Sequence, residues 1–281
     1  MTPQPRQRFA QHWLRSEAAL EQIVEAACVK NCDRILEIGP GTGILTYPLL
    51  EAARSVVAVE IDRDLCKRLI KRWGQREDFL LLQGDILSLN VDELLEEFPN
   101  PNFKTPNKVV ANLPYNITGP ILERLLGTIA RPRIPPYDTL VLLVQKEVGD
   151  RLVAQPNSKT FGALSVRMQY LAQCDFIYEV PASAFSPPPK VNSAVVRLTP
   201  WRDRQQQGQV VATDPRHLAT LVKLGFSSRR KMLRNNLKGS IDRDRLTPLL
   251  EQLEIDPNAR AEQLSVEQWV ALSNQLVNSS V

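Results

Sequence analysis

Residues with the chemistry to hold a nucleoside begin at a glycine-rich loop. Residues 37–43 read EIGPGTG, follow an apolar run and precede a helical pattern. Glycine suits this place because a side chain would keep the backbone away from a ligand above the carboxyl end of a strand. A dinucleotide loop reads GxGxxG, whereas this one reads GxGxG followed by Ile44, which favours a nucleoside without a pyrophosphate. The alternative is a tight turn that binds nothing.

Carboxylates follow the next two apolar runs. Glu60, in VEID at residues 59–62, comes 21 residues after Gly39 and can accept hydrogen bonds from both hydroxyls of a ribose. Asp85, in QGDI at residues 83–86, can accept one from the amino group of adenine. A single acid after a strand is often only a solvated helix cap. Three successive strand ends that carry such residues favour a common nucleoside site.

A fourth apolar run ends in Asn112-Leu113-Pro114-Tyr115, a turn suited to an aromatic amine. The N6 lone pair of adenine is delocalised into the ring, so the amine must move toward tetrahedral geometry before it attacks a methyl group. The Asn112 side-chain oxygen and the Leu113 carbonyl can accept its two N–H groups, and Tyr115 offers a face for an extruded base. The turn resembles the Asn-x-Pro-Tyr signature of methyltransferases that act on such amines. A plain turn is the alternative.

Another aromatic side chain, Phe185, comes shortly before three consecutive prolines at residues 187–189. The prolines reduce the entropy that this loop loses on folding and can hold Phe185 over the second face of the base. The alternative is a proline-stiffened connection whose phenylalanine fills the core.

These residues need a sheet to bring them together, and the apolar pattern predicts one. Short apolar runs alternate with helical patterns, which is typical of a parallel sheet with crossover helices. The expected strands are residues 35–38, 56–61, 79–82, 109–111, 140–144, 176–180 and 194–198. The expected helices are residues 17–28, 44–53, 64–73, 92–98, 120–129 and 162–171. The predicted fold class is α/β, a Rossmann-like methyltransferase domain with a seven-stranded, mostly parallel sheet.

The pattern changes after Trp201, where residues 202–209 read RDRQQQGQ and no apolar strand follows. We therefore expect two domains, residues 1–200 and a small all-helical domain of residues 201–281. Helix starts are expected in the second domain at Asp214-Pro215, at Asp256-Pro257 and at a capping box of Ser265 with Gln268.

Basic residues are concentrated in this helical domain. Residues 215–241 contain seven Lys or Arg and no Asp or Glu, whereas solvated helices usually mix charges to form pairs four residues apart. A lattice of phosphates suits such a run, and a solvated face is the alternative. Ser227 and Ser228 are expected to cap a helix that presents part of it. The residues expected to bind RNA, which we call the basic cluster, are Lys223, Arg229, Arg230, Lys231, Arg234 and Lys238.

Composition excludes several classes of protein. The chain has 281 residues, a formal net charge of +4 and 43% hydrophobic residues, which fits a globular protein rather than a disordered or fibrous one. Its four Cys form no CxxC pair and it has only two His, so we expect no metal centre and a reducing compartment. The N-terminus does not resemble a signal peptide and no long apolar run occurs, which predicts a cytoplasmic protein. The sequence has no exposed heptad pattern that would predict a dimer, so we expect a monomer.

Taken together, the motifs resemble one family closely, the bacterial small-subunit ribosomal RNA adenine dimethyltransferases, known as the kasugamycin-sensitivity enzymes. The resemblance runs from about Arg6 to the end of the chain and includes ILEIGPGTGILT, ANLPYNIT, FSPPPKVNSAVVRL and FSSRRKMLRNNL. It implies the cofactor S-adenosylmethionine and dimethylation of two adjacent adenosines near the 3′ end of 16S ribosomal RNA, in an immature small subunit. In that family an N-terminal segment, here residues 1–30, helps to close the cofactor site. His12 stands where the family usually has Asn, and Ala10 where it usually has Gly.

The strand-end motifs and the resemblance together predict the site. The expected cofactor-binding residues are His12, Leu14, Glu37, Gly39, Gly41, Glu60, Ile61, Asp85, Ile86 and Asn112. The expected catalytic residues are Asn112, Leu113, Pro114, Tyr115 and Phe185.

Two other functions stay open. One is that of the macrolide-resistance family, which methylates one adenine of 23S ribosomal RNA with the same core. The other is that of a ribosome assembly or nucleic-acid-binding factor in which catalysis is secondary. The sequences NLPYNIT and RRKMLRNNL favour the small-subunit enzyme.

Overall fold

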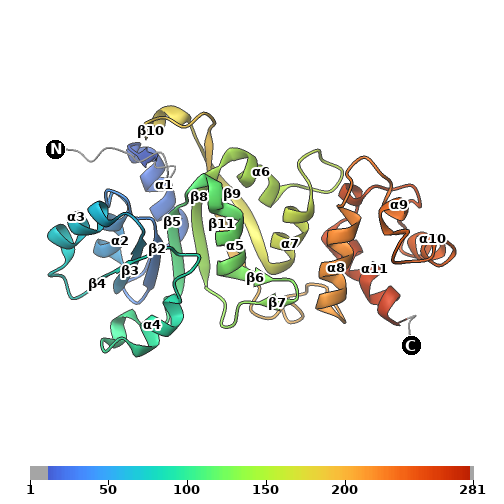
Figure 1. Ribbon diagram of the computed structural model, residues 1–281, viewed down its shortest axis with the longest axis horizontal. Coiled ribbons are helices and arrows are strands. Elements are labelled where there is room, and N and C mark those ends of the chain that lie inside the picture. Colours follow the sequence, from blue (N-terminus) through green and yellow to red (C-terminus); the bar gives the residue numbers. More distant parts are fainter. Residues whose placement is uncertain (1–11, 279–281) are drawn as a thin grey trace. The chain divides into compact units, whose positions relative to one another are not determined.

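A seven-stranded sheet is the main feature of the computed structural model, which describes residues 12–278 (Figure 1). The strand order is β4-β3-β2-β5-β8-β11-β9. All seven predicted strands are confirmed, although β9 begins four residues earlier than expected. The strands are β2 (Arg34–Ile38), β3 (Ser55–Glu60), β4 (Phe79–Gln83), β5 (Lys108–Asn112), β8 (Thr139–Gln145), β9 (Ala172–Val180) and β11 (Ser193–Pro200).

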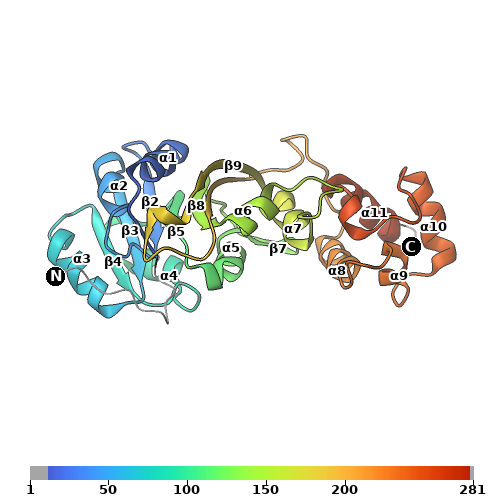
Figure 2. The ribbon, with the colours of Figure 1, turned by 90° about the horizontal axis from the view of Figure 1, so that it is seen from above.

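Helices cover both faces of this sheet. Figure 2 shows α1 and α2 on one face and α4 and α5 on the other. The six predicted helices are confirmed with small shifts at their ends, but α6 was not predicted, because it follows β8 without a turn residue to mark a new element. The bounds are α1 (Glu17–Ala27), α2 (Thr46–Ala52), α3 (Arg63–Trp73), α4 (Val91–Glu97), α5 (Thr118–Leu126), α6 (Lys146–Val153) and α7 (Ala163–Leu171).

Burial on both faces of the sheet explains why these strands could be predicted from apolar runs in the sequence. The strands β4, β3, β2, β5 and β8 are parallel, and every residue of β3 is buried. Parallel strands covered by helices on both faces are apolar along their whole length rather than at alternate positions. The next strand in the sheet, β11, is antiparallel to β8.

The strand order reverses at β2, which positions the predicted site. β3 pairs with one side of β2 and β5 with the other. At such a switch point the loops at the carboxyl ends of the strands diverge and leave a crevice. The loops after β2, β3, β4 and β5 carry EIGPGTG, VEID, QGDI and NLPY, so all four motifs meet at one edge of the sheet.

The chain divides into two compact units, which are described separately. The first contains the residues up to Leu125 together with residues 137–149 and 175–199. The second contains residues 126–136 and 150–174 and the residues from Pro200 on. The last of these divisions, before Pro200, lies one residue from the predicted boundary after residue 200. The second unit also takes in α7, from within the predicted first domain, because α7 packs against α8 and α11.

The part of the second unit after residue 200 is helical, as predicted. The starts at Asp214 and at the capping box of Ser265 with Gln268 are confirmed by their hydrogen bonds. The start predicted at Asp256 is wrong, because its carboxylate accepts a hydrogen bond from the Asn258 amide in an isolated turn. The helices are α8 (Pro215–Gly225), α9 (Leu233–Leu237), α10 (Arg243–Gln252) and α11 (Val266–Asn278).

Two short strand pairs lie outside the main sheet. β1 (Trp13–Leu14) pairs with β10 (Phe185–Ser186), and β6 (Gly127–Thr128) pairs with β7 (Arg131–Pro132). Neither pair was predicted, because two-residue strands leave no alternating pattern. Within residues 12–278, no helix combines the length and the apolar character needed to cross a bilayer.

A buried ion pair joins three segments at the amino ends of the strands. The Lys108 Nζ lies 2.8 Å from the Asp33 Oδ2 and donates to the carbonyls of Ala27 at 3.0 Å and Cys28 at 2.7 Å. Burial alone would raise the pKa of Asp33, but hydrogen bonds from Lys108 and Asn107 lower it below its ordinary value. Lys108 therefore ties the end of α1 to the starts of β2 and β5.

We predict that Lys108→Met lowers the free energy of unfolding by about 3–5 kcal/mol, because the Asp33 carboxylate is left buried without its counter-ion. Denaturant unfolding at neutral pH measures this loss. The double variant with Asp33→Asn should recover at least half of it, and equal losses in both variants would contradict the argument. The pKa of Asp33 in the folded protein lies below its ordinary value of 3.8. The stability that Asp33 contributes is therefore fully present above pH 3.8 and is lost as the pH falls through the lowered folded-state pKa.

Candidate active site

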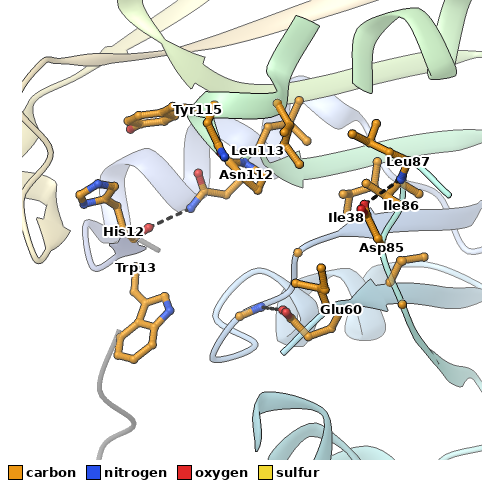
Figure 3. Close-up of a pocket in the computed structure, with 18 residues that line it drawn as sticks. His12, Trp13, Ile38, Glu60, Asp85, Ile86, Leu87, Asn112, Leu113 and Tyr115 are labelled. Carbon is orange, nitrogen blue, oxygen red and sulfur yellow. Dashed lines mark hydrogen bonds between the residues drawn. The ribbon is translucent and has the colours of Figure 1, made fainter. Parts of the chain in front are cut away.

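A cavity of about 320 Å³ opens at the carboxyl ends of β2, β3, β4 and β5 (Figure 3). All four strand-end motifs and the segment around β1 contribute to its wall. The predicted residues that line it are His12, Gly39, Gly41, Glu60, Ile61, Asp85, Ile86, Asn112, Leu113, Pro114 and Tyr115. The structure therefore brings together most of the residues that the sequence predicted for the site.

Two glycines after β2 have backbone angles that other residues rarely adopt. The φ angle is +67° at Gly39 and +59° at Gly41. The Gly39 N–H donates to the Val59 carbonyl at 2.9 Å, and the Gly41 N–H donates to the Glu60 Oε2 at 3.1 Å. A Cβ at Gly41 would stand 3.5 Å from the Trp13 Cδ1. The loop thus presents bare backbone to the cavity and holds Glu60 in place.

Glu60 is buried at the end of β3, with 4% of its surface exposed. Its oxygens accept hydrogen bonds from the amides of Gly41 and Asp62, the latter at 2.8 Å. Burial outweighs these bonds and raises the pKa of Glu60 above its ordinary value. Each carboxylate oxygen can accept more than one hydrogen bond, so Glu60 is positioned in advance and can still receive the hydroxyls of a ribose.

Asp85 begins a tight turn that forms another part of the wall. Its Oδ1 accepts a hydrogen bond from the Leu87 amide at 2.9 Å, and its carbonyl accepts one from the Leu89 amide at 2.8 Å. Ile86, which is buried, and Leu87 line the cavity beside it. An acceptor next to apolar side chains suits adenine, whose amino group can donate to Asp85 while its ring packs on Ile86.

The backbone of His12 fixes the side chain of Asn112. The Asn112 Nδ2 donates to the His12 carbonyl at 3.3 Å, as Figure 3 shows. This bond determines which side of the amide carries the nitrogen and leaves the Oδ1 as an acceptor. The next residue, Leu113, donates its N–H to the Leu143 carbonyl at 3.0 Å and so anchors the turn to β8.

Tyr115 completes the turn with an aromatic face. Its ring stacks on the His12 imidazole with centroids 5.8 Å apart and planes inclined by 20°. Its hydroxyl lies 2.5 Å from the Ser193 Oγ, and burial raises the pKa of Tyr115, so the hydroxyl stays protonated at neutral pH. The Thr118 Oγ1 donates to the Pro114 carbonyl at 3.1 Å and supports the turn from α5.

Glu37 is the most unusual charged group of the site. Burial, with a further contribution from the charge of Glu60, raises the pKa of Glu37 to about 8. The side chain of Thr46 lowers this pKa in part, but within residues 12–278 neither carboxylate oxygen makes a hydrogen bond of good geometry. Glu37 and Leu14 line a second cavity of about 30 Å³, which shares Trp13 and Asn112 with the larger one. That volume accommodates about one water molecule.

The structure does not place Phe185 over a base. Its side chain is 4% exposed and belongs to a hydrophobic cluster with Leu14 and Val180. Its backbone pairs with Leu14 where β1 meets β10. The expectation that Phe185 contributes a stacking face is not met in this structure, because the ring fills the core beneath this strand pair. That outcome is the alternative that the proline-rich sequence left open.

Trp13 and Ser193 are site residues that sequence reasoning missed. Trp13 lines both cavities, and its Nε1 is buried without a hydrogen-bond partner among the described residues. Ser193 holds the hydroxyl of Tyr115 from the first residue of β11. Their roles depend on contacts with residues far away in the chain, which no local pattern reveals. Residues 1–11 of the predicted closing segment lie outside the described part of the chain.

The polar groups of the two cavities fit S-adenosylmethionine. Glu60 offers acceptors for a ribose and Asp85 an acceptor for the adenine amine. The buried Glu37 suits a positively charged group, since a cation would offset the cost of burying its carboxylate. The described residues, 12–278, contain no group of His, Cys, Asp or Glu that could hold a metal ion.

The basic cluster of the second unit lies on two helices and the turn between them. Five of its six residues are exposed, and Arg234 is partly buried. The prediction that Ser227 and Ser228 cap a helix is wrong, because α9 is short and begins after Met232. The cluster is distributed over α8 (Lys223), the turn (Arg229, Arg230 and Lys231), α9 (Arg234) and the C-cap of α9 (Lys238).

Arg229 differs from its neighbours in the basic cluster. It donates hydrogen bonds to the Lys159 carbonyl at 2.6 Å and the Phe161 carbonyl at 3.4 Å. Arg229 therefore supports the loop that leads into α7. Part of the basic run thus has a structural role that its charge pattern did not indicate.

Known proteins resemble this chain over nearly its whole length. The small-subunit ribosomal RNA methyltransferase A of Rippkaea orientalis is 62% identical over 274 residues, covering 98% of each chain. The crystal structure of a dimethyladenosine transferase from Plasmodium falciparum matches with a TM-score of 0.78 at 24% identity and covers 96% of this chain and 99% of that one. The crystal structure of the 23S rRNA methyltransferase ErmE matches with a TM-score of 0.70 at 25% identity and covers 94% and 99%.

The solved structures show a shared fold, and the sequence matches show the family to which the chain belongs. The family model described as ribosomal RNA adenine dimethylase matches residues 3–278, a range that includes every residue lining the cavity. With this match and a relative that is 62% identical over 98% of the chain, the fold and the site lead to one conclusion. The chain belongs to the ribosomal RNA adenine dimethylase family.

Proposed function

We propose that this protein transfers methyl groups from S-adenosylmethionine to the N6 amines of two adjacent adenosines near the 3′ end of 16S ribosomal RNA, and that it dimethylates each of them. The observation that carries the proposal is the turn of residues 112–115, whose acceptors line the same cavity as Glu60 and Asp85. The name of the relative from Rippkaea orientalis, a small-subunit RNA methyltransferase, supports this choice of RNA.

The turn provides what an adenine amine needs in order to react. The Asn112 Oδ1 and the Leu113 carbonyl accept hydrogen bonds from the amine and favour its tetrahedral form, in which the nitrogen lone pair is available. Tyr115 offers its face to the extruded base, with its hydroxyl held by Ser193. S-adenosylmethionine, when bound, supplies an electrophilic methyl group on a positively charged sulfur.

The two compact units have different parts in this proposal. The first holds the cofactor, and Trp13 and the His12 backbone help to close the cofactor site. The second grips ribosomal RNA of an immature small subunit through the basic cluster. We place the reaction in the cytoplasm and assign it to a monomer, as the sequence pattern leads us to expect.

Methylation of 23S ribosomal RNA is the second candidate. The match to ErmE supports a fold that both activities share, whereas the relative that is 62% identical carries the small-subunit name. A role in ribosome assembly is compatible with catalysis, because an intact acceptor turn and a basic surface serve different steps.

Tritium transfer from labelled S-adenosylmethionine tests the proposed function. Separate reactions contain small-subunit particles that lack these methyl groups, 23S ribosomal RNA, or no RNA acceptor. We expect label in the small-subunit particles, recovered as N6,N6-dimethyladenosine. Label only in 23S ribosomal RNA would favour the second candidate, and label in neither would favour a binding factor.

We predict that Asn112→Ala lowers kcat about a hundredfold to a thousandfold, because its Oδ1 matters most as the amine becomes tetrahedral. Calorimetric affinity for S-adenosylhomocysteine should stay within about threefold of the wild type. Asn90→Ala, at the start of α4 and outside the cavity, is the matched control and should retain activity. Equal turnover by Asn112→Ala and the wild type would refute the acceptor role.

We also predict that cofactor binding releases a proton from Glu37. With a pKa raised to about 8, Glu37 is protonated at neutral pH in the folded protein, and a bound cation should lower that pKa. Titration of S-adenosylmethionine, which carries the cationic sulfur, in buffers of different ionisation enthalpy should show release of nearly one proton near pH 7. The variant Glu37→Gln should show none, and the same enthalpy in every buffer for the wild type would rule the idea out.

The sign for protein stability follows from the same group. A raised carboxyl pKa means that the folded protein binds the proton more tightly than the unfolded chain. The contribution of Glu37 is therefore complete below pH 4.5, its ordinary value, and is lost as the pH rises toward about 8. Glu37→Gln should flatten this decline in the free energy of unfolding.

The basic cluster predicts a salt dependence of RNA binding. Each phosphate contact that is lost should reduce the slope of log affinity against log salt concentration by about 0.7–0.9, because fewer counterions are released. The slope comes from filter binding of small-subunit RNA across a salt series. The triple variant removes three of the four exposed cations that have no structural contact described above, Lys223→Gln, Arg230→Gln and Lys231→Gln.

A matched variant separates this effect from net charge. It removes three exposed cations from α3 of the first unit, Arg63→Gln, Lys67→Gln and Lys71→Gln. We expect a larger change of slope in the basic-cluster variant, with cofactor affinity unchanged in both. Equal slopes in the two variants would return the basic cluster to the solvated-face interpretation.

A further inference from the structure

The loop that carries Asp85 is a single turn held by hydrogen bonds to its first residue. The amides of Ser88 and Leu89 both donate to the Asp85 carbonyl, at 3.0 and 2.8 Å, and the Leu87 amide donates to the Asp85 side chain. The donors in these bonds are the amides of residues 87–89, and the Leu89 carbonyl in turn accepts a hydrogen bond from the Val91 amide at 3.0 Å. We call residues 85–89 the adenine loop.

Arg124, on α5, holds the carbonyls of Leu87 and Leu89. Its Nη1 donates to the Leu87 carbonyl at 3.4 Å, and its Nη2 donates to the Leu89 carbonyl. A guanidinium can reach two acceptors at once because its donors form a rigid planar fork, which a lysine ammonium lacks. Arg124 is partly buried and does not line the cavity, so it touches the loop rather than the ligand space.

The adenine loop also packs tightly against the cavity wall. A Cβ on Gly84 would lie 3.2 Å from the Leu89 Cδ1, so Leu89 rests directly on this glycine of the wall. A shift of Leu89 would therefore move the wall and the Asp85 carboxylate with it. Arg124 holds the loop at the residue where such a shift would begin.

The same helix supports the acceptor turn at its other end. Thr118, the first residue of α5, donates its hydroxyl hydrogen to the Pro114 carbonyl, six residues before Arg124. A helix is stiff over this distance of about 9 Å. α5 therefore sets the spacing between the turn of residues 112–115 and the adenine loop.

From these contacts we propose that Arg124 is a positioning residue for cofactor recognition, which holds Asp85 so that the site selects adenine over other purines. The proposal rests on the proposed function, since it requires that the cavity binds the adenosine part of S-adenosylmethionine. Arg124 acts through the adenine loop and has no contact with the reacting groups.

Two nucleosides that differ at one group test this role. S-adenosylhomocysteine has an amine at C6 that donates to Asp85, whereas S-inosylhomocysteine has an oxygen there, which Asp85 repels. An unpaired buried acceptor costs enough to make the wild type prefer the adenosine compound by about tenfold to a hundredfold in calorimetric Kd. Arg124→Met should reduce this preference to about threefold or less.

Control variants show whether the effect is local. Asp85→Asn should abolish the preference, because its amide can accept a hydrogen bond from the adenine amine or, after rotating, donate one to the inosine oxygen. Arg54→Met, a matched arginine whose Nε donates to the Asn102 Oδ1 outside the cavity, should keep the wild-type ratio. Denaturant unfolding should give the same midpoint for Arg124→Met and Arg54→Met within about 0.3 M.

Each outcome has a definite meaning. A wild-type ratio in Arg124→Met overturns the proposal. Loss of affinity for both compounds to the same extent, together with a lower unfolding midpoint, also overturns it, because it shows a merely structural role. If the wild type binds neither compound, the cofactor assignment fails and the proposal fails with it. If both proteins bind the compounds and Arg124→Met keeps the wild-type ratio, only the proposal about Arg124 fails and the proposed function stands.

Discussion

Burial of the Glu37 carboxylate is the constraint on which the site depends. A carboxylate that only the Thr46 side chain supports is costly to bury in its charged form, so the pKa of Glu37 is raised to about 8 and the group is protonated at neutral pH. Its neighbour Glu60 is held differently, by the amides of Gly41 and Asp62. The glycine loop therefore serves both acids, since it brings bare backbone to the cavity and hydrogen bonds to Glu60. A cationic ligand offsets the cost of burying Glu37 in its charged form, and this interaction favours binding of the ligand.

The parts of the fold that sequence predicted are those set by local patterns. The seven strands of the sheet read as apolar runs, and the strand-end motifs met at one edge because parallel strands share their direction. The adenine loop and the turn at residue 112 were found in this way. The burial of Phe185 and the role of Trp13 were not, because both depend on β1 pairing with β10 across more than 170 residues. The helix α6 was missed for a local reason, the absence of a turn before it.

The roles of individual arginines also depend on contacts that the sequence pattern does not reveal. Arg229 was assigned to RNA from its place in a basic run, yet it binds the carbonyls of Lys159 and Phe161. Arg124 stood out in no pattern, yet it binds the carbonyls of Leu87 and Leu89. A guanidinium serves a phosphate or a pair of carbonyls with the same planar fork. Charge spacing therefore indicates where cations gather, and only the fold shows which of them are already engaged.

Dimethylation places a further demand on the acceptor turn. After the first transfer the amine keeps one N–H, so the new methyl group must replace the other N–H beside one of the two acceptors. The Leu113 carbonyl belongs to a backbone anchored on β8 by a 3.0 Å bond and cannot move aside. The Asn112 amide is held by a longer bond of 3.3 Å to the His12 carbonyl, and its side chain can rotate away when that bond breaks. Under the proposed reaction, the remaining N–H therefore stays on Leu113 and the first methyl group turns toward Asn112. The weaker of the two supports is then the one that allows the second transfer.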